Sequence, residues 1–134
     1  MAVVRHDIHP IQSDDDVVRA RQKVREWAVQ AGFSLVEQTK LVTAASELAR
    51  NTLVHGGGGA ALLETVHDGA RRGLRLTFTD KGPGIADVAR ALSDGYTTGF
   101  GLGLGLGGAK RLSNEFEISS APGQGTRVRI ARWV

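Results

Sequence analysis

The sequence contains no cysteine, only three prolines and a single methionine among its 134 residues. The absence of cysteine excludes disulfide bonds, thiolate catalysis and cysteine-ligated zinc sites. No apolar run reaches the roughly 18 residues of a membrane-spanning helix, because charged residues or glycines interrupt every stretch. The N-terminus lacks the charged and apolar regions of a secretory signal. We therefore expect a cytoplasmic protein with no membrane segment.

Charge of one sign is not concentrated anywhere in the chain. Seventeen lysines and arginines stand against fourteen aspartates and glutamates, for a formal charge of +3, and the basic residues are dispersed. Nucleic-acid binders usually show a clustered basic face with a recognisable reading module, and the sequence has neither. A DNA-binding regulator is therefore disfavoured; it would bind duplex with an affinity that falls steeply as salt rises.

Glycine is the residue in excess, with 18 copies. Ten of them lie in two clusters, Gly56–Gly59 and the segment from Gly99 to Gly108. This clustering is too local for a fibrous repeat, and the hydrophobic content of 41% argues against disorder. A chain of this length fits one domain, residues 1–134, with a sizeable hydrophobic core.

Hydrophobic periodicity predicts an α+β fold. A helix that follows Ser13 and carries Trp27 at a core-spaced position should end at Gly32. A second helix should begin at Ser34, with Glu37 completing a capping box. The order of elements is not a strict strand–helix alternation, so we expect a mostly antiparallel sheet with helices on one face. The other predicted segments are strands at 3–11, 60–67, 74–79, 116–120 and 126–133, helices at 86–92 and 106–114, and a loop at 93–101.

Glu47 and Asn51 form the first pair suited to chemistry. They are four residues apart in the second predicted helix, which puts them on one face with Cβ atoms about 6 Å apart. Asparagine can give Mg²⁺ one oxygen ligand while phosphates and water supply the rest. Glutamate can accept a proton from water or a hydroxyl. Taken alone, such a pair is more often a solvated polar face of a helix.

The segment Asp80-Lys81-Gly82-Pro83-Gly84 directly follows a predicted strand. An aspartate there can accept a hydrogen bond from an exocyclic amine, and the glycines would let a flat ring approach the backbone. The alternative is a plain turn. Gly125-Thr126, at the start of the last predicted strand, is by itself only a hairpin entry.

Glycine and leucine alternate over much of the segment from Gly99 to Gly108, directly before a predicted helix. Glycines free backbone N–H groups to face phosphate oxygens, and a helix N-terminus adds a partial positive charge. The segment is not a P-loop, because the Gly-Lys-Ser/Thr ending is missing. A flexible linker is the alternative, but linkers favour serine and other polar residues over leucine. We expect a lid that faces phosphate.

The order of these four motifs resembles the GHKL nucleotide-binding family of gyrase, MutL, Hsp-ninety chaperones and histidine kinases. The resemblance covers residues 34–128 and implies the Bergerat fold, a two-layer α/β sandwich that binds ATP. It implies that Glu47 is the general base, that Asn51 is the Mg²⁺ ligand and that Asp80 accepts the adenine amine. The other residues that it places around ATP are Gly82, Gly84, Gly101, Gly103, Gly105, Leu106 and Thr126, while Lys110 and Arg111 either reach the γ-phosphate or form a solvated helix face.

Within the family, the sequence most resembles the stand-alone anti-sigma and RsbT-like switch kinases. The chain has no residues for the transducer domains of gyrase, MutL or the chaperones. His6 and His9 lie in a predicted strand, so neither sits in the phosphoacceptor helix hairpin of a histidine kinase. The stretches that carry the narrower resemblance are residues 46–51, 94–98, 110–112 and 115–118, together with Gly125, Thr126, Val128 and Trp133.

The narrower resemblance implies an ATP- and Mg²⁺-dependent serine/threonine kinase that phosphorylates STAS-domain antagonist proteins in partner-switching regulation of stress responses or sigma factors. A downstream phosphatase or sigma-regulating effector is a further implied partner, and related proteins can form homodimers. The run Gly56–Gly59 and the long glycine-leucine segment depart from the group's pattern, which leaves the mobility of the lid open. The alternative is a module that binds nucleotide and sequesters a partner without turnover. The presence of both Glu47 and Asn51 argues against that alternative.

Overall fold

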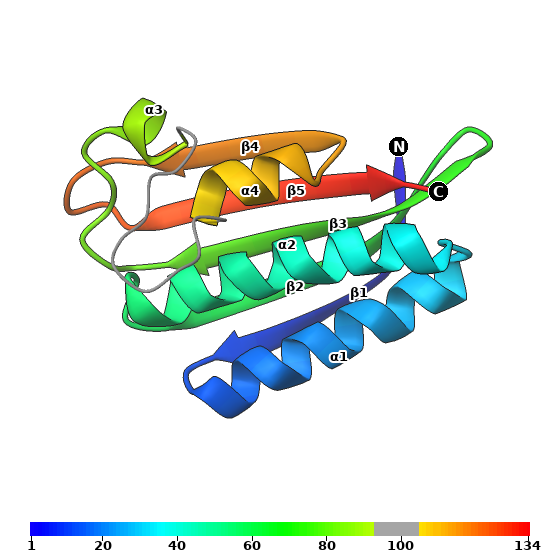
Figure 1. The fold of residues 1–134 in the computed structure, drawn as a ribbon, viewed down its shortest axis with the longest axis horizontal. Coiled ribbons are helices and arrows are strands. Elements are labelled where there is room, and N and C mark those ends of the chain that lie inside the picture. Colours follow the sequence, from blue (N-terminus) through cyan, green and yellow to red (C-terminus); the bar gives the residue numbers. More distant parts are fainter. Residues whose placement is uncertain (93–104) are drawn as a thin grey trace.

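The computed structural model describes residues 1–92 and 105–134, and it has the predicted α+β architecture. One five-stranded sheet has the order β1-β2-β3-β5-β4, with antiparallel pairing at each step. Helices α1, α2 and α4 cover one face of this sheet (Figure 1). The elements are β1 (Ala2–Ile11), α1 (Asp14–Ala31), α2 (Leu35–Val54), β2 (Gly59–Asp68), β3 (Arg71–Asp80), α3 (Val88–Ala91), α4 (Gly105–Arg111), β4 (Glu115–Ser120) and β5 (Thr126–Trp133).

Helix α1 begins and ends at the predicted residues. The Ser13 side chain accepts a hydrogen bond from the Asp16 N–H at 3.2 Å, and three aspartates occupy the first turn, where the helix dipole favours negative charge. Gly32 ends the helix with φ of 95°, a left-handed conformation that suits glycine. The boundaries of α1 are therefore decided by local chemistry.

The predicted capping box at the start of α2 is only half formed. Ser34 Oγ accepts the Glu37 N–H at 3.3 Å, as expected. The Glu37 carboxylate does not return to the cap; within the described residues it pairs instead with Arg132 of β5 and Lys40. An ion pair with a guanidinium is stronger than a neutral cap contact, so the tertiary partner displaces the local one.

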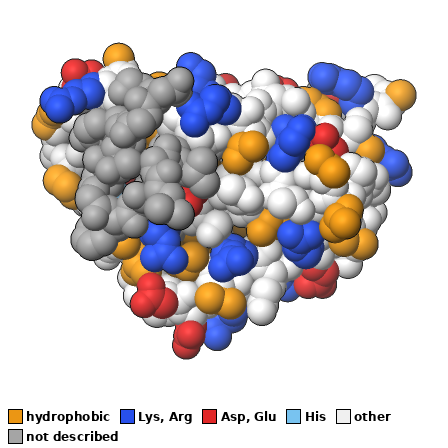
Figure 2. Space-filling view, viewed as in Figure 1, with side chains coloured by type: hydrophobic (Ala, Val, Ile, Leu, Met, Phe, Trp, Pro, Cys, Tyr) orange, Lys and Arg blue, Asp and Glu red, His pale blue; other side chains and the backbone are white. Residues whose placement is uncertain are grey.

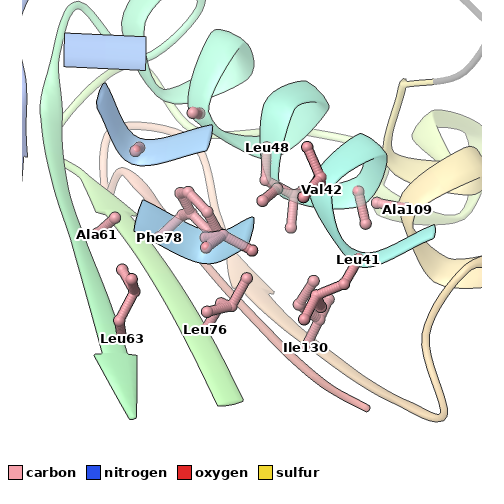
Figure 3. Close-up of a cluster of buried hydrophobic side chains, with 14 of the residues drawn as sticks. Leu41, Val42, Leu48, Ala61, Leu63, Leu76, Phe78, Ala109 and Ile130 are labelled. Carbon is pink, nitrogen blue, oxygen red and sulfur yellow. The ribbon is translucent and has the colours of Figure 1, made fainter. Parts of the chain in front are cut away.

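The core lies between the helices and the sheet. Figure 3 shows Leu41, Val42 and Leu48 of α2 directed toward side chains of the central strands. Those strand residues alternate along the chain, as expected for a sheet with one covered face. Burying each large apolar side chain contributes roughly 1.5–3 kcal/mol. The labelled strand residues are Ala61 and Leu63 of β2, Leu76 and Phe78 of β3, and Ile130 of β5, all of them buried.

The two ends of β3 define the two ends of the sheet. At the first, the Asp80 end, Asp80 pairs with Gly59 of β2 and Thr126 of β5. At the second, the Arg72 end, Arg72 pairs with His67, and its carbonyl accepts the Val134 N–H at 2.7 Å. Eight residues of strand separate Arg72 from Asp80, which corresponds to about 26 Å. The two ends are thus far apart on a small molecule.

Two predicted helices are shorter than expected, and one predicted loop cannot be compared. The helix expected at 86–92 spans Val88–Ala91, and the one expected at 106–114 spans Gly105–Arg111. The loop expected at 93–101 lies outside the described residues. Ends of short helices depend on contacts that sequence periodicity does not report.

The surface matches the dispersed charge of the sequence. Figure 2 shows lysine and arginine side chains spread over the visible face, between hydrophobic and acidic ones. Within residues 1–92 and 105–134, no helix is both long and apolar enough to span a membrane.

Candidate functional site

A cavity of about 480 Å³ opens at the Asp80 end of the sheet. It lies between the last turns of α2, the end of β3, the segment that follows β3, and the starts of α4 and β5. We call it the Asp80 cavity. Of the residues singled out by the sequence, it brings together Glu47, Asn51, Asp80, Gly84, Gly105, Leu106 and Thr126.

Helix geometry places Glu47 and Asn51 side by side on the wall of this cavity. Both side chains line it and both residues are half-buried. The backbone carbonyl of Asn51 accepts the N–H groups of His55 at 3.0 Å and Gly56 at 3.1 Å, which closes the last turn of α2. The pair therefore faces a concave space. This excludes the alternative that the two residues belong to a solvated polar face of the helix.

Asp80 ends β3 with its carboxylate held by the following turn. Asp80 Oδ1 accepts the Gly82 N–H at 2.9 Å. The backbone of Gly56 covers the same carboxylate so closely that a Cβ on Gly56 would lie 2.3 Å from Asp80 Cγ. The sequence shows Gly56 only as a member of a glycine cluster, and no local signal could have revealed this contact. A residue with a side chain at position 56 would have to displace Asp80.

Gly82 and Gly84 have different surroundings. Gly82 packs on the backbone of Gly56 and does not line the cavity. Gly84 does line it, with φ of 78°, and a Cβ there would lie 1.9 Å from the carbonyl oxygen of Ala121. Close packing therefore explains why position 82 is a glycine. At position 84, both the positive φ and close packing require glycine.

The Ser120 hydroxyl joins three segments of the cavity wall. Ser120 Oγ accepts the Ile85 N–H at 2.8 Å and donates to the Gly125 carbonyl at 2.9 Å. Its one proton is then used, so the Thr126 hydroxyl at 2.8 Å must be the donor in the Ser120–Thr126 bond. Thr126 Oγ1 consequently keeps its lone pairs free and can serve as an acceptor. The sequence did not point to Ser120.

Only some of the described residues predicted to contact phosphate line the Asp80 cavity. Gly105 and Leu106, at the start of α4, line the cavity. Lys110 and Arg111 lie in the last turn of α4 and do not line it. Gly101 and Gly103 lie outside the described residues.

Arg50 and Arg90 are cationic residues that line the cavity and that the sequence analysis did not single out; Arg50 lies nearer Glu47 and Asn51 along the chain. Arg50 lines the cavity directly before Asn51 and three positions after Glu47, and its side chain is exposed. Within residues 1–92 and 105–134, its guanidinium makes no ion pair or hydrogen bond. A count of helix positions around Glu47 would have found it.

The cavity combines an apolar wall with a few polar groups. Phe78, Ile85 and Val128 give apolar contacts suited to a flat ring, and Asp80 and Thr126 offer acceptors beside them. Glu47, Arg50 and Asn51 lie along the α2 side. Such a mixture is typical of small-molecule sites, in which a few polar groups fix the orientation of the ligand.

Known proteins resemble this chain both in sequence and in structure. The family model of the histidine kinase-, DNA gyrase B- and HSP90-like ATPases matches residues 36–133. The serine/threonine-protein kinase RsbT of Bacillus subtilis is 42% identical over 124 residues, which cover 92% of this chain and 93% of RsbT. An anti-sigma F factor of Thermoanaerobacter is 28% identical over 121 residues, covering 86% and 83% of the two chains.

A solved structure supports the fold. The histidine kinase domain of the Erythrobacter litoralis blue-light activated histidine kinase EL346 superposes with a TM-score of 0.55 at 18% identity, covering 92% of this chain and 60% of that one. The family model and the 42% identity to RsbT confirm the prediction of a GHKL-type kinase domain that uses ATP. The chain belongs to the histidine kinase-, DNA gyrase B- and HSP90-like ATPase family.

Proposed function

We propose that this protein is an ATP- and Mg²⁺-dependent serine/threonine kinase that phosphorylates STAS-domain antagonist proteins in a partner switch. The observation that carries the proposal is the convergence of Glu47, Asn51 and Asp80 on one cavity. The chain that builds this cavity is 42% identical to a serine/threonine-protein kinase over nearly its whole length. Phosphoryl transfer requires mainly positioning and charge neutralisation, which a cavity of this kind can supply.

The adenine ring would occupy the end of the cavity beside β3 and β5. The Asp80 carboxylate would accept a hydrogen bond from the exocyclic amine, and the free lone pairs of Thr126 would support the ring directly or through water. Gly84 and Ile85 would lie against the ring, because Ser120 holds their segment in place. This orientation directs the phosphates toward α2 and Gly105.

The α2 side of the cavity would carry the transfer. Glu47 would accept the proton of the incoming serine or threonine hydroxyl, whose oxygen bonds to the γ-phosphorus as the bond to ADP breaks. Within the described residues, no group of three or more histidine, aspartate or glutamate side chains is arranged to hold a metal ion. An amide oxygen from Asn51 therefore suits an ion that takes its other ligands from phosphates and water. Mg²⁺ bound there would neutralise charge on the phosphates.

Arg50 would supply the positive charge for which the sequence offered Lys110 and Arg111, with a solvated helix face as their alternative. It lies beside both Glu47 and Asn51 and within the described residues has no competing acidic partner, whereas α4 carries Lys110 and Arg111 away from the cavity. Arg50→Ala should reduce phosphate transfer about 100-fold or more while leaving adenosine binding unchanged. Lys110→Ala is the matched control and should change transfer much less. A larger effect of Lys110→Ala would reverse the two assignments.

The same proposal places the protein in the cytoplasm as a signalling component. Its output would pass through protein partners, namely a STAS-domain substrate and a downstream phosphatase or sigma-regulating effector. A homodimer is compatible with the kinship to anti-sigma factors.

The direct test is transfer of label from [γ-³²P]ATP to a cognate STAS protein in the presence of Mg²⁺. We expect label on the STAS protein, and its loss in Glu47→Gln. Glu26→Gln, the same change on the exposed face of α1, is the control and should leave transfer intact. Undiminished transfer by Glu47→Gln would remove the general-base assignment. ATP binding by calorimetry without transfer to any STAS protein would favour the partner-sequestering module.

A further inference from the structure

A second cavity, of about 290 Å³, lies at the Arg72 end of the sheet. It is formed where the end of α1 lies over the helix-covered face of β1, β2 and β3, and we call it the Trp27 cavity. No aspartate or glutamate is among its lining residues in the part of the chain that the structure describes. The polar and aromatic side chains around it are Arg5, Trp27, Gln30, Thr65, His67 and Arg72.

Trp27 lines this cavity, and the donor of its indole is unused. Trp27 is 2% exposed, and its Nε1–H has no hydrogen-bond partner among the described residues. Indole nitrogens that are buried in proteins usually find an acceptor. An acceptor bound beside it would satisfy this N–H. Core packing, which explains the ring, does not explain the position of its polar atom.

Two guanidinium groups accompany the indole. Arg5 stacks over the Trp27 ring, with Cζ 3.9 Å from the ring centroid, and it donates to Gln30 Oε1 at 2.5 Å. The Arg72 guanidinium makes no hydrogen bond or ion pair within residues 1–92 and 105–134, and its Nη2 lies beside the end of α1 at Gly32. Two cations beside one cavity without a carboxylate repel each other, and an anion between them would remove that repulsion.

We propose that the Trp27 cavity binds an oxyanion, a carboxylate or a phosphate group, through Trp27 Nε1, Arg5 and Arg72. Donors dominate this cavity, and guanidinium groups match the geometry of such oxygens. The group could belong to an acidic side chain of a partner or to free phosphate, and the two sources share this chemistry. The proposal does not depend on the kinase assignment, because the Asp80 cavity lies about 26 Å away along β3.

The test follows the two indole N–H signals of the ¹⁵N-labelled protein by NMR. Trp133 is an internal control, because its Nε1 already donates to Glu115 Oε2 at 2.6 Å. Sodium phosphate and N-acetylaspartate are titrated separately against sodium chloride at equal ionic strength. We expect the Trp27 signal to move saturably with one or both oxyanions, but not with chloride, while the Trp133 signal stays. The oxyanion that binds more tightly identifies the source.

Variants separate binding from stability. Arg5→Ala and Arg72→Ala should each weaken the affinity about tenfold or more, whereas Arg21→Ala, an exposed arginine of α1, should leave it unchanged. Trp27→Phe, measured by calorimetry, should also weaken binding, because the ring remains and only the donor is lost. Arg72→Gln replaces Arg72→Ala if the latter does not fold. The proposal is overturned if neither oxyanion moves the Trp27 signal, if both indole signals move together, or if Arg72→Ala lowers the melting temperature without changing affinity.

Discussion

The two ends of the sheet are built from different groups. At the Asp80 end, backbones approach one another so closely that a Cβ on Gly56, Gly84 or Gly125 would overlap a neighbouring atom. At the Arg72 end, large side chains such as Trp27 and Arg72 make the walls. Both ends hold a cavity. The comparison teaches that the closely packed glycines around the Asp80 cavity are intolerant of added atoms, whereas the walls of the Trp27 cavity should respond mainly to changes of charge and hydrogen bonding.

The sharpest way to test the close packing at the Asp80 end is to add one methyl group at two of its glycines that have nearly the same φ. Gly84 and Gly123 have φ of 78° and 76°, but a Cβ on Gly84 would lie 1.9 Å from Ala121 O, whereas a Cβ on Gly123 would meet nothing within 4 Å. Gly84→Ala should therefore lower the free energy of unfolding by about 3 kcal/mol. Gly123→Ala should lower it by only about 1 kcal/mol, the cost of the left-handed backbone.

Urea denaturation measures both variants. Equal losses in Gly84→Ala and Gly123→Ala would mean that backbone conformation alone decides the tolerance of these turns. Close packing around the Asp80 cavity would then not be what limits substitution there.

Ser120→Ala should have the next largest effect. It removes the hydroxyl that bonds to Ile85, Gly125 and Thr126, at a cost of about 2 kcal/mol in stability. Because these segments form the proposed adenine site, ATP affinity should also fall, by about tenfold. Calorimetric titration with ATP measures it.

Ser113 offers the matched control for that change. Its hydroxyl makes one bond, to the Ala109 carbonyl at 2.7 Å, and it does not line the Asp80 cavity. Ser113→Ala should cost about 1 kcal/mol and leave ATP affinity unchanged. A Ser120→Ala protein that binds ATP normally would show that the hydroxyl supports the fold but not the site.

The smallest effect should come from an ion pair away from the Asp80 cavity. Hydrogen bonding to Arg132 holds the pKa of Glu37 below its ordinary value of 4.5. The folded state thus gains stability from this pair above about pH 4.5 and loses it as the pH falls through the lowered pKa. Wild-type protein should therefore lose more stability than Glu37→Gln between about pH 5 and the acid limit of folding.

A double-mutant cycle checks that assignment. In an Arg132→Leu background, Glu37→Gln should no longer change the acid dependence of unfolding, because the partner that lowers the pKa is gone. Urea unfolding at several pH values supplies the data. A difference that persists without Arg132 would point to Lys40 as the main partner.

Predictions from the sequence agree with the structure where they depend on contacts between residues close together in the chain. Ser13 and Gly32 bound α1, and Glu47 and Asn51 share a face, because caps and helix periodicity act within a few residues. Such predictions fail where contacts join distant segments. The Glu37 carboxylate bonds to Arg132, 95 residues away, instead of completing the capping box. The backbone of Gly56 covers Asp80, 24 residues away. Spacing in the chain gives no information on such pairs.

The sequence by itself determined the α+β class, the family resemblance and the types of residue available for nucleotide chemistry. Only the tertiary structure decided which of them meet: Asp80 and Thr126 come together through strand pairing, and Arg50 takes the place beside the cavity that Lys110 does not occupy. It also left the Trp27 N–H without a partner among the described residues. The physical reason is that periodicity and caps are set by neighbours along the chain, whereas packing brings together residues that the chain keeps apart.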